Sequence, residues 1–414
     1  EKQKLFSKAV ENFDKSIKLD SENFMTLYTF GDCLYYYSEI LPEKEGVIAI
    51  EKAISLFEKA LEKEPKNHYL LTLYGDCLIY LIGKKDKKFS SDILNKAINI
   101  YDQAIDIKND DISSIANSGL AYLELAMISK EKEIYTVYFN RALESLIRAN
   151  KLNPKEHGLL RLHAKFLLNF SQKEDFHKSF DLINQGIDKL RDSLDIKKDS
   201  LTTYLLSEAL LEKAKILSNS ESEPLLKESI SIAKNQLLED PKNKFLIIIL
   251  GLIMNELSFL EIKKDNSFIE DLNLLISKCN EYLRSEPEEI SIINTLGRSY
   301  LMQVFKEEVH INNLINEAIN SFEKSLLIKN NLESNIYLGL AYIEKWKIDQ
   351  TEESINKAIE KFNEIKKDDI VWATYNLACI YSLLNDLQTS IKYLEESFKN
   401  NIKISRNRIL IDKD

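Results

Sequence analysis

The chain has 414 residues, of which 66 are acidic and 56 are basic, and its formal net charge at pH 7 is −10. An acidic balance of this size argues against nucleic acid or an anionic membrane surface as the main partner. Hydrophobic residues make up 44% of the chain, enough for a core, whereas only 10 glycines and 6 prolines are present, which favours long helices over strands joined by tight turns.

The first predicted element is a single helix at about residues 4–19, and a repeated pattern follows it. Six of the ten glycines recur in similar local strings, at Gly31, Gly75, Gly119, Gly251, Gly297 and Gly339. The first two intervals are both 44 residues, and the third, 132 residues, is three times that period. Glycines placed by one repeating rule predict positions where two helices cross closely, not phosphate-binding loops.

A second helical string follows each glycine, with small and large residues three and four positions apart. Ala53, Phe57 and Ala60 are one example, and their spacing puts them on one face of a helix. Neither string shows the alternation of a strand. We therefore predict nine pairs of antiparallel helices after the first helix, with the most degenerate units at about 156–240 and a short tail at 400–414.

This pattern resembles the tetratricopeptide repeat (TPR). The nearest match is the last unit, which begins at Trp372 and has Ala378 and Ser390 twelve residues apart. The other units are longer: Gly31 and Ala53 are 22 residues apart, so their helices are predicted to be extended. The resemblance covers essentially the whole chain. It implies an all-α, right-handed superhelical solenoid of antiparallel helix pairs, forming one domain over residues 1–414 and binding other proteins.

A search for chemistry finds no catalytic, cofactor-binding or metal site. The five histidines form no HExxH pair, and no glycine-rich nucleotide-binding motif is present. The four cysteines, Cys33, Cys77, Cys279 and Cys379, are spread along the chain without a CxxC pair, so they form neither a disulfide framework nor a zinc site. We therefore expect these residues to contain no enzyme, no cofactor and no metal.

The resemblance also implies that the first helix of each pair lines a concave groove that takes peptides or partner helices. Carried over by position, the groove residues are Tyr28, Asp32, Tyr35, Tyr36, Tyr69, Asp76, Tyr80, Arg298, Trp372 and Tyr375. Asp32 and Asp76, one repeat apart, would form an acidic ladder for basic or aromatic groups. The alternative is that the tyrosines pack against the next helix. The family's lysine and asparagine clamp for acidic tails is not matched, because Tyr28 and Asp32 occupy those positions.

These features predict a non-catalytic scaffold or adaptor that binds a protein or peptide within a larger assembly. No run of residues approaches the roughly 18 apolar positions of a membrane span, so no membrane insertion is expected here. Two alternatives stay open. One is a helper subunit of a cell-envelope complex, associated with a transporter or a flagellar motor, and the other is the non-catalytic portion of a larger enzyme. Unpaired cysteines favour the cytoplasm, although a leader removed upstream of Glu1 would place the chain in the envelope or periplasm.

Overall fold

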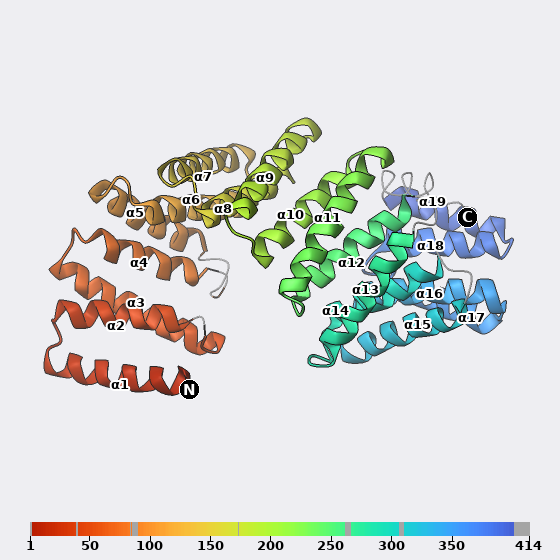
Figure 1. Ribbon diagram of the computed structural model, residues 1–414, viewed down its shortest axis with the longest axis horizontal. Coiled ribbons are helices and arrows are strands. Elements are labelled where there is room, and N and C mark those ends of the chain that lie inside the picture. Colours follow the sequence, from red (N-terminus) through yellow and green to blue (C-terminus); the bar gives the residue numbers. More distant parts are fainter. Residues whose placement is uncertain are drawn as a thin grey trace. The chain divides into compact units, whose positions relative to one another are not determined.

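The computed structural model describes residues 2–38, 40–82, 84, 90–172, 174–260, 266–305 and 310–400. Over these residues it contains nineteen α-helices and no strand (Figure 1), which confirms the predicted all-α fold. The helices are α1 (Lys2–Leu19), α2 (Phe24–Ser38), α3 (Glu43–Lys63), α4 (His68–Tyr80), α5 (Ser90–Ile107), α6 (Ile112–Ile128), α7 (Lys132–Leu152), α8 (His157–Ser171), α9 (Phe176–Ile196), α10 (Ser200–Lys215), α11 (Asn219–Glu239), α12 (Lys244–Phe259), α13 (Asn266–Leu283), α14 (Ile290–Val304), α15 (Ile311–Ile328), α16 (Leu332–Asp349), α17 (Glu352–Ile365), α18 (Ile370–Leu383) and α19 (Leu387–Asn400). Of the predicted tail, residues 401–414 lie outside the described residues.

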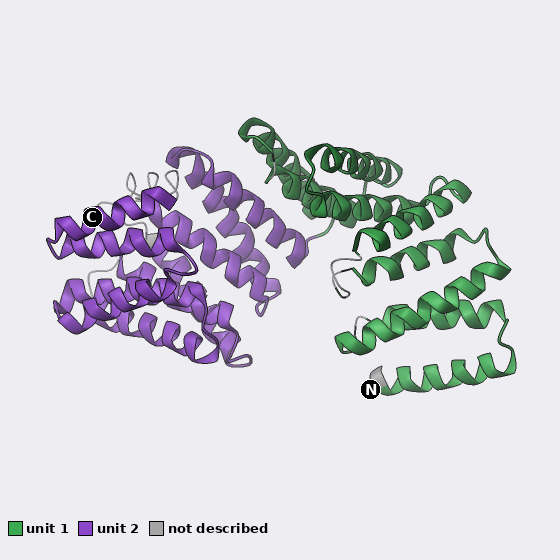
Figure 2. Cartoon of the chain, turned by 180° about the vertical axis from the view of Figure 1, so that it is seen from behind, with its two compact units in different colours: residues 1–197 green, residues 198–414 purple. Residues whose placement is uncertain are grey.

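The helices pack in consecutive pairs, α2 with α3, α4 with α5 and so on to α18 with α19. The chain divides into two compact units, residues 1–197 and 198–414, with the division between α9 and α10 (Figure 2). In unit 1, α2 contacts α4 and α4 contacts α6; in unit 2, α10, α12, α14, α16 and α18 contact one another in succession. The first helices of these neighbouring pairs therefore lie side by side, as in a helical repeat.

The repeating glycines are packing residues, as the sequence predicts. In four pairs the glycine of the first helix faces an aromatic ring of the second, and these contacts are Gly31 with Phe57, Gly75 with Tyr101, Gly297 with Phe322 and Gly339 with Phe362. A β-carbon at position 297 would lie 2.7 Å from the Phe322 ring, closer than real atoms approach. All four rings are fully buried, and each contributes on the order of 1.5–3 kcal/mol by leaving water.

The degenerate unit at α8 and α9 reaches the same packing with the small residue on the other helix. His163 takes the glycine position of α8 and is 8% exposed. Gly186 of α9 instead faces Leu168, whose side chain would lie 3.1 Å from a β-carbon there. Close approach of two helices requires one small residue at the crossing point, and either helix can supply it.

Helix lengths agree with the longer repeats. The second helices α3, α7, α9 and α11 have 21 residues each, whereas α18 and α19 have 14 each. The extra residues therefore lengthen mainly the second helices, whereas α4, with 13 residues, is no longer than α18. No helix within the described ranges is long and apolar enough to cross a membrane.

Candidate functional site

Local sequence positions a group of exposed aromatic side chains on α2. The side chain of Asn23 accepts hydrogen bonds from the backbone N–H and the hydroxyl of Thr26, at 3.0 and 3.1 Å, and fixes the start of the helix. Tyr28, Asp32 and Tyr36 follow at intervals of four residues and share one helix face. This face therefore presents two phenol rings on either side of one carboxylate.

The first turn of α4 adds a third tyrosine. The side chain of Asn67 accepts a 3.1 Å hydrogen bond from the backbone N–H of Leu70, which places Tyr69 at the start of the helix. Tyr69 and Tyr36 are 65% and 67% exposed, and Met25 on α2 is 62% exposed. We call Met25, Tyr28, Asp32, Tyr36 and Tyr69 the α2/α4 face. Large side chains exposed together in this way are typical of binding surfaces.

Electrostatics link the groups of this face. Burial raises the pKa of Tyr28, and the charges of Asp32, Tyr69 and Tyr36 raise it further, which places the four groups within electrostatic range of one another. Burial also raises the pKa of Asp32. Asp32 is half-buried, yet it makes no hydrogen bond or ion pair with another described residue. It is therefore a partly desolvated carboxylate that a cation would stabilise.

Asp76, the residue predicted to act with Asp32, is used inside the protein. Its Oδ1 accepts 2.7 Å hydrogen bonds from the hydroxyl of Tyr101 and from the side-chain amide of Asn117. Burial raises its pKa, and the two hydrogen bonds oppose that shift. The two carboxylates of the predicted acidic ladder are therefore not equivalent: Asp76 is hydrogen-bonded within the protein through Oδ1, and Asp32 is not.

The difference between the two aspartates has a residue-level cause. The donors to Asp76 lie 25 and 41 positions after it, at Tyr101 and Asn117. The residues at the same distances from Asp32 are Phe57 and Leu73, which have no side-chain donor. Phe57 packs on Gly31 as Tyr101 packs on Gly75, but its ring has no hydroxyl to donate to Asp32.

Two other predicted residues of unit 1 also serve the fold. The hydroxyl of Tyr80 donates a 3.1 Å hydrogen bond to the carbonyl of Ser38 at the end of α2. Tyr35 is half-buried and packs against the hydrophobic core of α2 to α5. The alternative interpretation, that tyrosines pack against neighbouring helices, holds for Tyr80 and Tyr35 and not for Tyr36 and Tyr69.

The predicted residues of unit 2 are largely covered. Tyr375 and Arg298 are each 5% exposed, and Trp372 is half-buried against the core that includes α16 and α18. Arg298 Nη1 lies 3.4 Å from Glu333 Oε1, and the guanidinium lies 5.6 Å from the ring centre of Tyr337. These side chains stabilise unit 2 and offer little surface to a partner.

Sequence reasoning missed a hollow between α5 and α7, with a volume of about 870 Å³. Its lining includes the carboxylates of Asp102, Asp106 and Glu133 and the aliphatic side chains of Ile134 and Val137. We call it the α5/α7 hollow. A signal was present in the sequence. Ile134 and Val137 are spaced for one helix face, but they do not belong to the string of core residues on α7 that includes Ala142 and Leu146.

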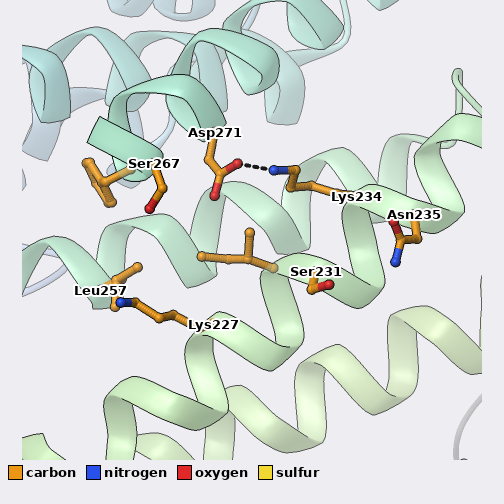
Figure 3. Close-up of a pocket in the computed structure, with 9 residues that line it drawn as sticks. Lys227, Ser231, Lys234, Asn235, Leu257, Ser267 and Asp271 are labelled. Atoms are coloured by element: carbon orange, nitrogen blue, oxygen red, sulfur yellow. Dashed lines mark hydrogen bonds and ion pairs between the residues drawn. The ribbon is translucent and has the colours of Figure 1, made fainter. Parts of the chain in front are cut away.

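A smaller hollow of about 300 Å³ lies in unit 2, where α11, α12 and α13 meet. Figure 3 shows Lys234 and Asp271 joined by an ion pair at this hollow. Lys227, also in its lining, pairs with Glu223 at 2.9 Å. The charged residues that line this smaller hollow are therefore largely neutralised within the protein. In the described part of the chain, no group of three or more His, Cys, Asp or Glu side chains is placed to hold a metal ion.

Comparison with known proteins identifies one family and several distant folds. Residues 373–401 match the family model of the tetratricopeptide repeat, and no curated protein matches the chain. Similar solved structures include TTC0263, a thermophilic TPR protein of Thermus thermophilus, with 16% identity over 54% of this chain and 94% of that chain and a TM-score of 0.40. Human IFIT1, solved as a dimer with m7Gppp-AAAA, has 14% identity over 96% and 87% of the two chains and a TM-score of 0.43. Yeast Tom70 has 12% identity over 99% and 92%, with a TM-score of 0.39.

These structural likenesses are too distant to indicate a ligand or a partner. The family match and the internal geometry carry the assignment. The matched pair, α18 and α19, has a small residue, Ala378, in the glycine position, and the hydroxyl of Ser390 donates a 2.8 Å hydrogen bond to its carbonyl. Small-residue crossings of the same kind recur in the other helix pairs described above. The last helix pair is therefore a tetratricopeptide repeat by its family match, and the rest of the chain is an all-α repeat of helix pairs that cross in the same way.

Proposed function

We propose that this chain is a non-catalytic adaptor that holds a segment of a partner protein on the α2/α4 face, within a larger assembly. The partner segment carries a lysine or arginine, and its cation pairs with the carboxylate of Asp32. The observation that supports this proposal is the state of Asp32, which is half-buried, has a raised pKa and has no hydrogen-bond or ion-pair partner among the described residues.

A cationic side chain fits this face in two ways. It restores the electrostatic stabilisation that Asp32 loses by partial burial. The faces of tyrosine rings also attract cations, by about 0.5–1 kcal/mol for each exposed contact. Tyr36 and Tyr69 supply such rings, and tyrosine loses little conformational entropy on binding. Carboxylate and rings together favour a basic residue over a neutral or acidic one.

A protein partner fits better than nucleic acid. The chain carries a net charge of −10, and the only charged residue of the α2/α4 face is Asp32. Phosphate groups would be repelled there, because nucleic-acid binding depends on lysine and arginine that neutralise phosphates. Basic peptide segments meet the opposite situation and are attracted by the field of the protein.

The test is selection of peptides from a random display library on the full chain, followed by affinity measurement by fluorescence anisotropy. We expect the selected peptides to be enriched in lysine or arginine. Asp32→Asn should weaken their binding at least about tenfold, which corresponds to 1.4 kcal/mol. Glu45→Gln removes an equivalent charge from an exposed position on α3 and should leave the affinity unchanged.

A second variant tests Asp32 without removing it. Phe57→Tyr combined with Leu73→Asn gives Asp32 the two donors that Asp76 has, and the carboxylate should then be satisfied internally. This variant should fold and should bind the selected peptides as weakly as Asp32→Asn does. The proposal would be refuted if the selected peptides were not enriched in basic residues. It would also be refuted if both variants bound the selected peptides with the affinity of the wild type. A pull-down that compares the wild type with Asp32→Asn then identifies the partners that depend on this face.

A further inference from the structure

The α5/α7 hollow has the chemistry of a second docking site, and it shares no residue with the α2/α4 face. We propose that it binds an amphipathic helix of a partner protein, with aliphatic side chains on the face that enters the hollow and lysine or arginine along its edges. This inference is independent of the proposed role of Asp32, because it depends on the side chains of α5, α6 and α7 only.

Part of the lining of the hollow is apolar. Ile134 and Val137 lie one turn apart on α7 and are 42% and 53% exposed. Tyr138 is half-buried beside them, and its ring stacks on that of Tyr122 at 6.3 Å between ring centres. Covering such side chains removes apolar surface from water, which favours a complex. An aliphatic ridge on a partner helix would do this.

Another part of the lining is acidic. Asp102 and Asp106 are four residues apart on α5, and Glu133 lies in the first turn of α7. None of the three carboxylates makes a hydrogen bond or ion pair with another described residue. Burial and the charge of Asp106 raise the pKa of Asp102, and Arg141 opposes that shift. Like charges on neighbouring turns repel one another, and an incoming cation would relieve the repulsion.

The one basic residue among those that line the hollow offsets only part of this negative charge. Arg141 Nη1 donates a 3.2 Å hydrogen bond to the hydroxyl of Tyr122, and its guanidinium lies 5.6 Å from the centre of that ring. The carboxylates of Asp102, Asp106 and Glu133 against one guanidinium leave the hollow with two excess negative charges. The partner chemistry that complements it is therefore both apolar and basic.

The hollow of unit 2 provides an internal comparison. It is lined in part by α11 and α13, which are also second helices of neighbouring pairs. There Asp271 already pairs with Lys234 (Figure 3), so a cation has little to add. The α5/α7 hollow is also larger, about 870 against 300 Å³, and most of its lining is exposed. It suits a helix lying along α5 and α7 better than an enclosed small molecule.

The test uses a synthetic peptide of leucine and lysine, spaced for an amphipathic helix of about four turns. Its affinity for the full chain is measured by fluorescence anisotropy at about 0.15 M salt, where the Debye length is about 8 Å. A leucine–glutamate peptide of the same spacing and an oligolysine of the same charge are the control probes. We expect the leucine–lysine peptide to bind, and the two control peptides to bind at least about tenfold more weakly.

Two double variants locate the binding. Asp102→Asn with Asp106→Asn removes the charge, and Ile134→Ser with Val137→Ser removes the exposed apolar surface. Each should weaken binding of the leucine–lysine peptide at least about tenfold. Asp110→Asn with Glu144→Gln removes two charges from exposed positions of the same unit outside the hollow and should change nothing. Circular dichroism confirms that each variant is folded.

Several outcomes would overturn the proposal. The proposal fails if the wild type does not bind the leucine–lysine peptide. It also fails if both hollow variants bind this peptide as tightly as the wild type does. Equal binding of oligolysine would show charge attraction alone. Concentration-dependent self-association that Ile134→Ser with Val137→Ser abolishes would assign the hollow to a second copy of this chain.

Discussion

The ring of Tyr101 fills the space beside the α-carbon of Gly75. Its hydroxyl then reaches the next residue of the same helix, donating a 2.7 Å hydrogen bond to Asp76. One side chain of α5 therefore sets the close approach of α4 and α5 and also satisfies the carboxylate of α4. Packing and polar chemistry are coupled at this crossing point, and the coupling engages Oδ1 of Asp76 within the protein.

Gly75→Ala should be more destabilising than Gly119→Ala. A β-carbon at position 75 would overlap the Tyr101 ring, which is fully buried, and such overpacking costs about 1–3 kcal/mol. At position 119 the nearest atom, Cβ of Ser145, lies 3.1 Å away, so a small adjustment suffices. Alanine also favours a helix over glycine by about 1 kcal/mol, which should make Gly119→Ala nearly neutral. Urea denaturation measures both, and the reverse order would contradict the packing described here.

Asp76→Ala and Asp76→Asn should have different effects on the stability of the fold. The alanine variant leaves the buried hydroxyl of Tyr101 and the amide of Asn117 without their acceptor, at a cost of about 1–3 kcal/mol. The asparagine variant keeps an acceptor oxygen in place of Oδ1 and removes the charge. Because burial raises the pKa of Asp76, the carboxylate destabilises the fold as the pH rises through that pKa. Asp76→Asn should therefore be at least as stable as the wild type at pH 7, as thermal denaturation will test.

The loss of stability on breaking the Arg298–Glu333 pair should depend on which of the two residues is replaced. Glu333→Ala leaves the buried guanidinium without its carboxylate and takes a 3.1 Å acceptor from Asn294, so we expect a loss of about 1–3 kcal/mol. Arg298→Met replaces the cation by an apolar side chain of similar length and should stay within about 1 kcal/mol of the wild type. Chemical denaturation of both variants measures the difference. A larger loss for Arg298→Met would show that the pair itself stabilises unit 2.

His163 should make stability depend on pH. Burial and the charge of Lys189 lower its pKa from 6.5 to about 4, so the folded state holds the ring neutral. The stability that this provides is complete above pH 6.5 and is lost as the pH falls from 6.5 to about 4, by on the order of 2–3 kcal/mol. The unfolding free energy of the wild type and of His163→Gln should be measured across this interval. The wild type should lose more stability than the variant, and parallel pH profiles would contradict the shift.

The fold could be predicted from sequence because its evidence is local and repeated. Glycines at a period of 44 residues and apolar residues at helical spacing act through neighbours on the same helix or the adjoining one. The contact of Gly31 with Phe57 therefore appears again at Gly75 and Tyr101, and each repeat supports the interpretation of the others. The division near residue 197 was not predicted, because it falls among the degenerate units, where that periodic signal is weakest.

The candidate site was only partly predictable, because exposure and pairing depend on residues from other helices. Asp32 and Asp76 occupy the same place in successive repeats, and the sequence treats them alike. The structure separates them, since Tyr101 and Asn117 donate to Asp76, whereas Phe57 and Leu73 offer Asp32 no hydrogen. The burial of Arg298 and the hollow between α5 and α7 also depend on residues from neighbouring helices. A helical period tells which way a side chain points from its own helix, but the neighbouring helices determine whether it meets water, a ring or a hydrogen-bond donor.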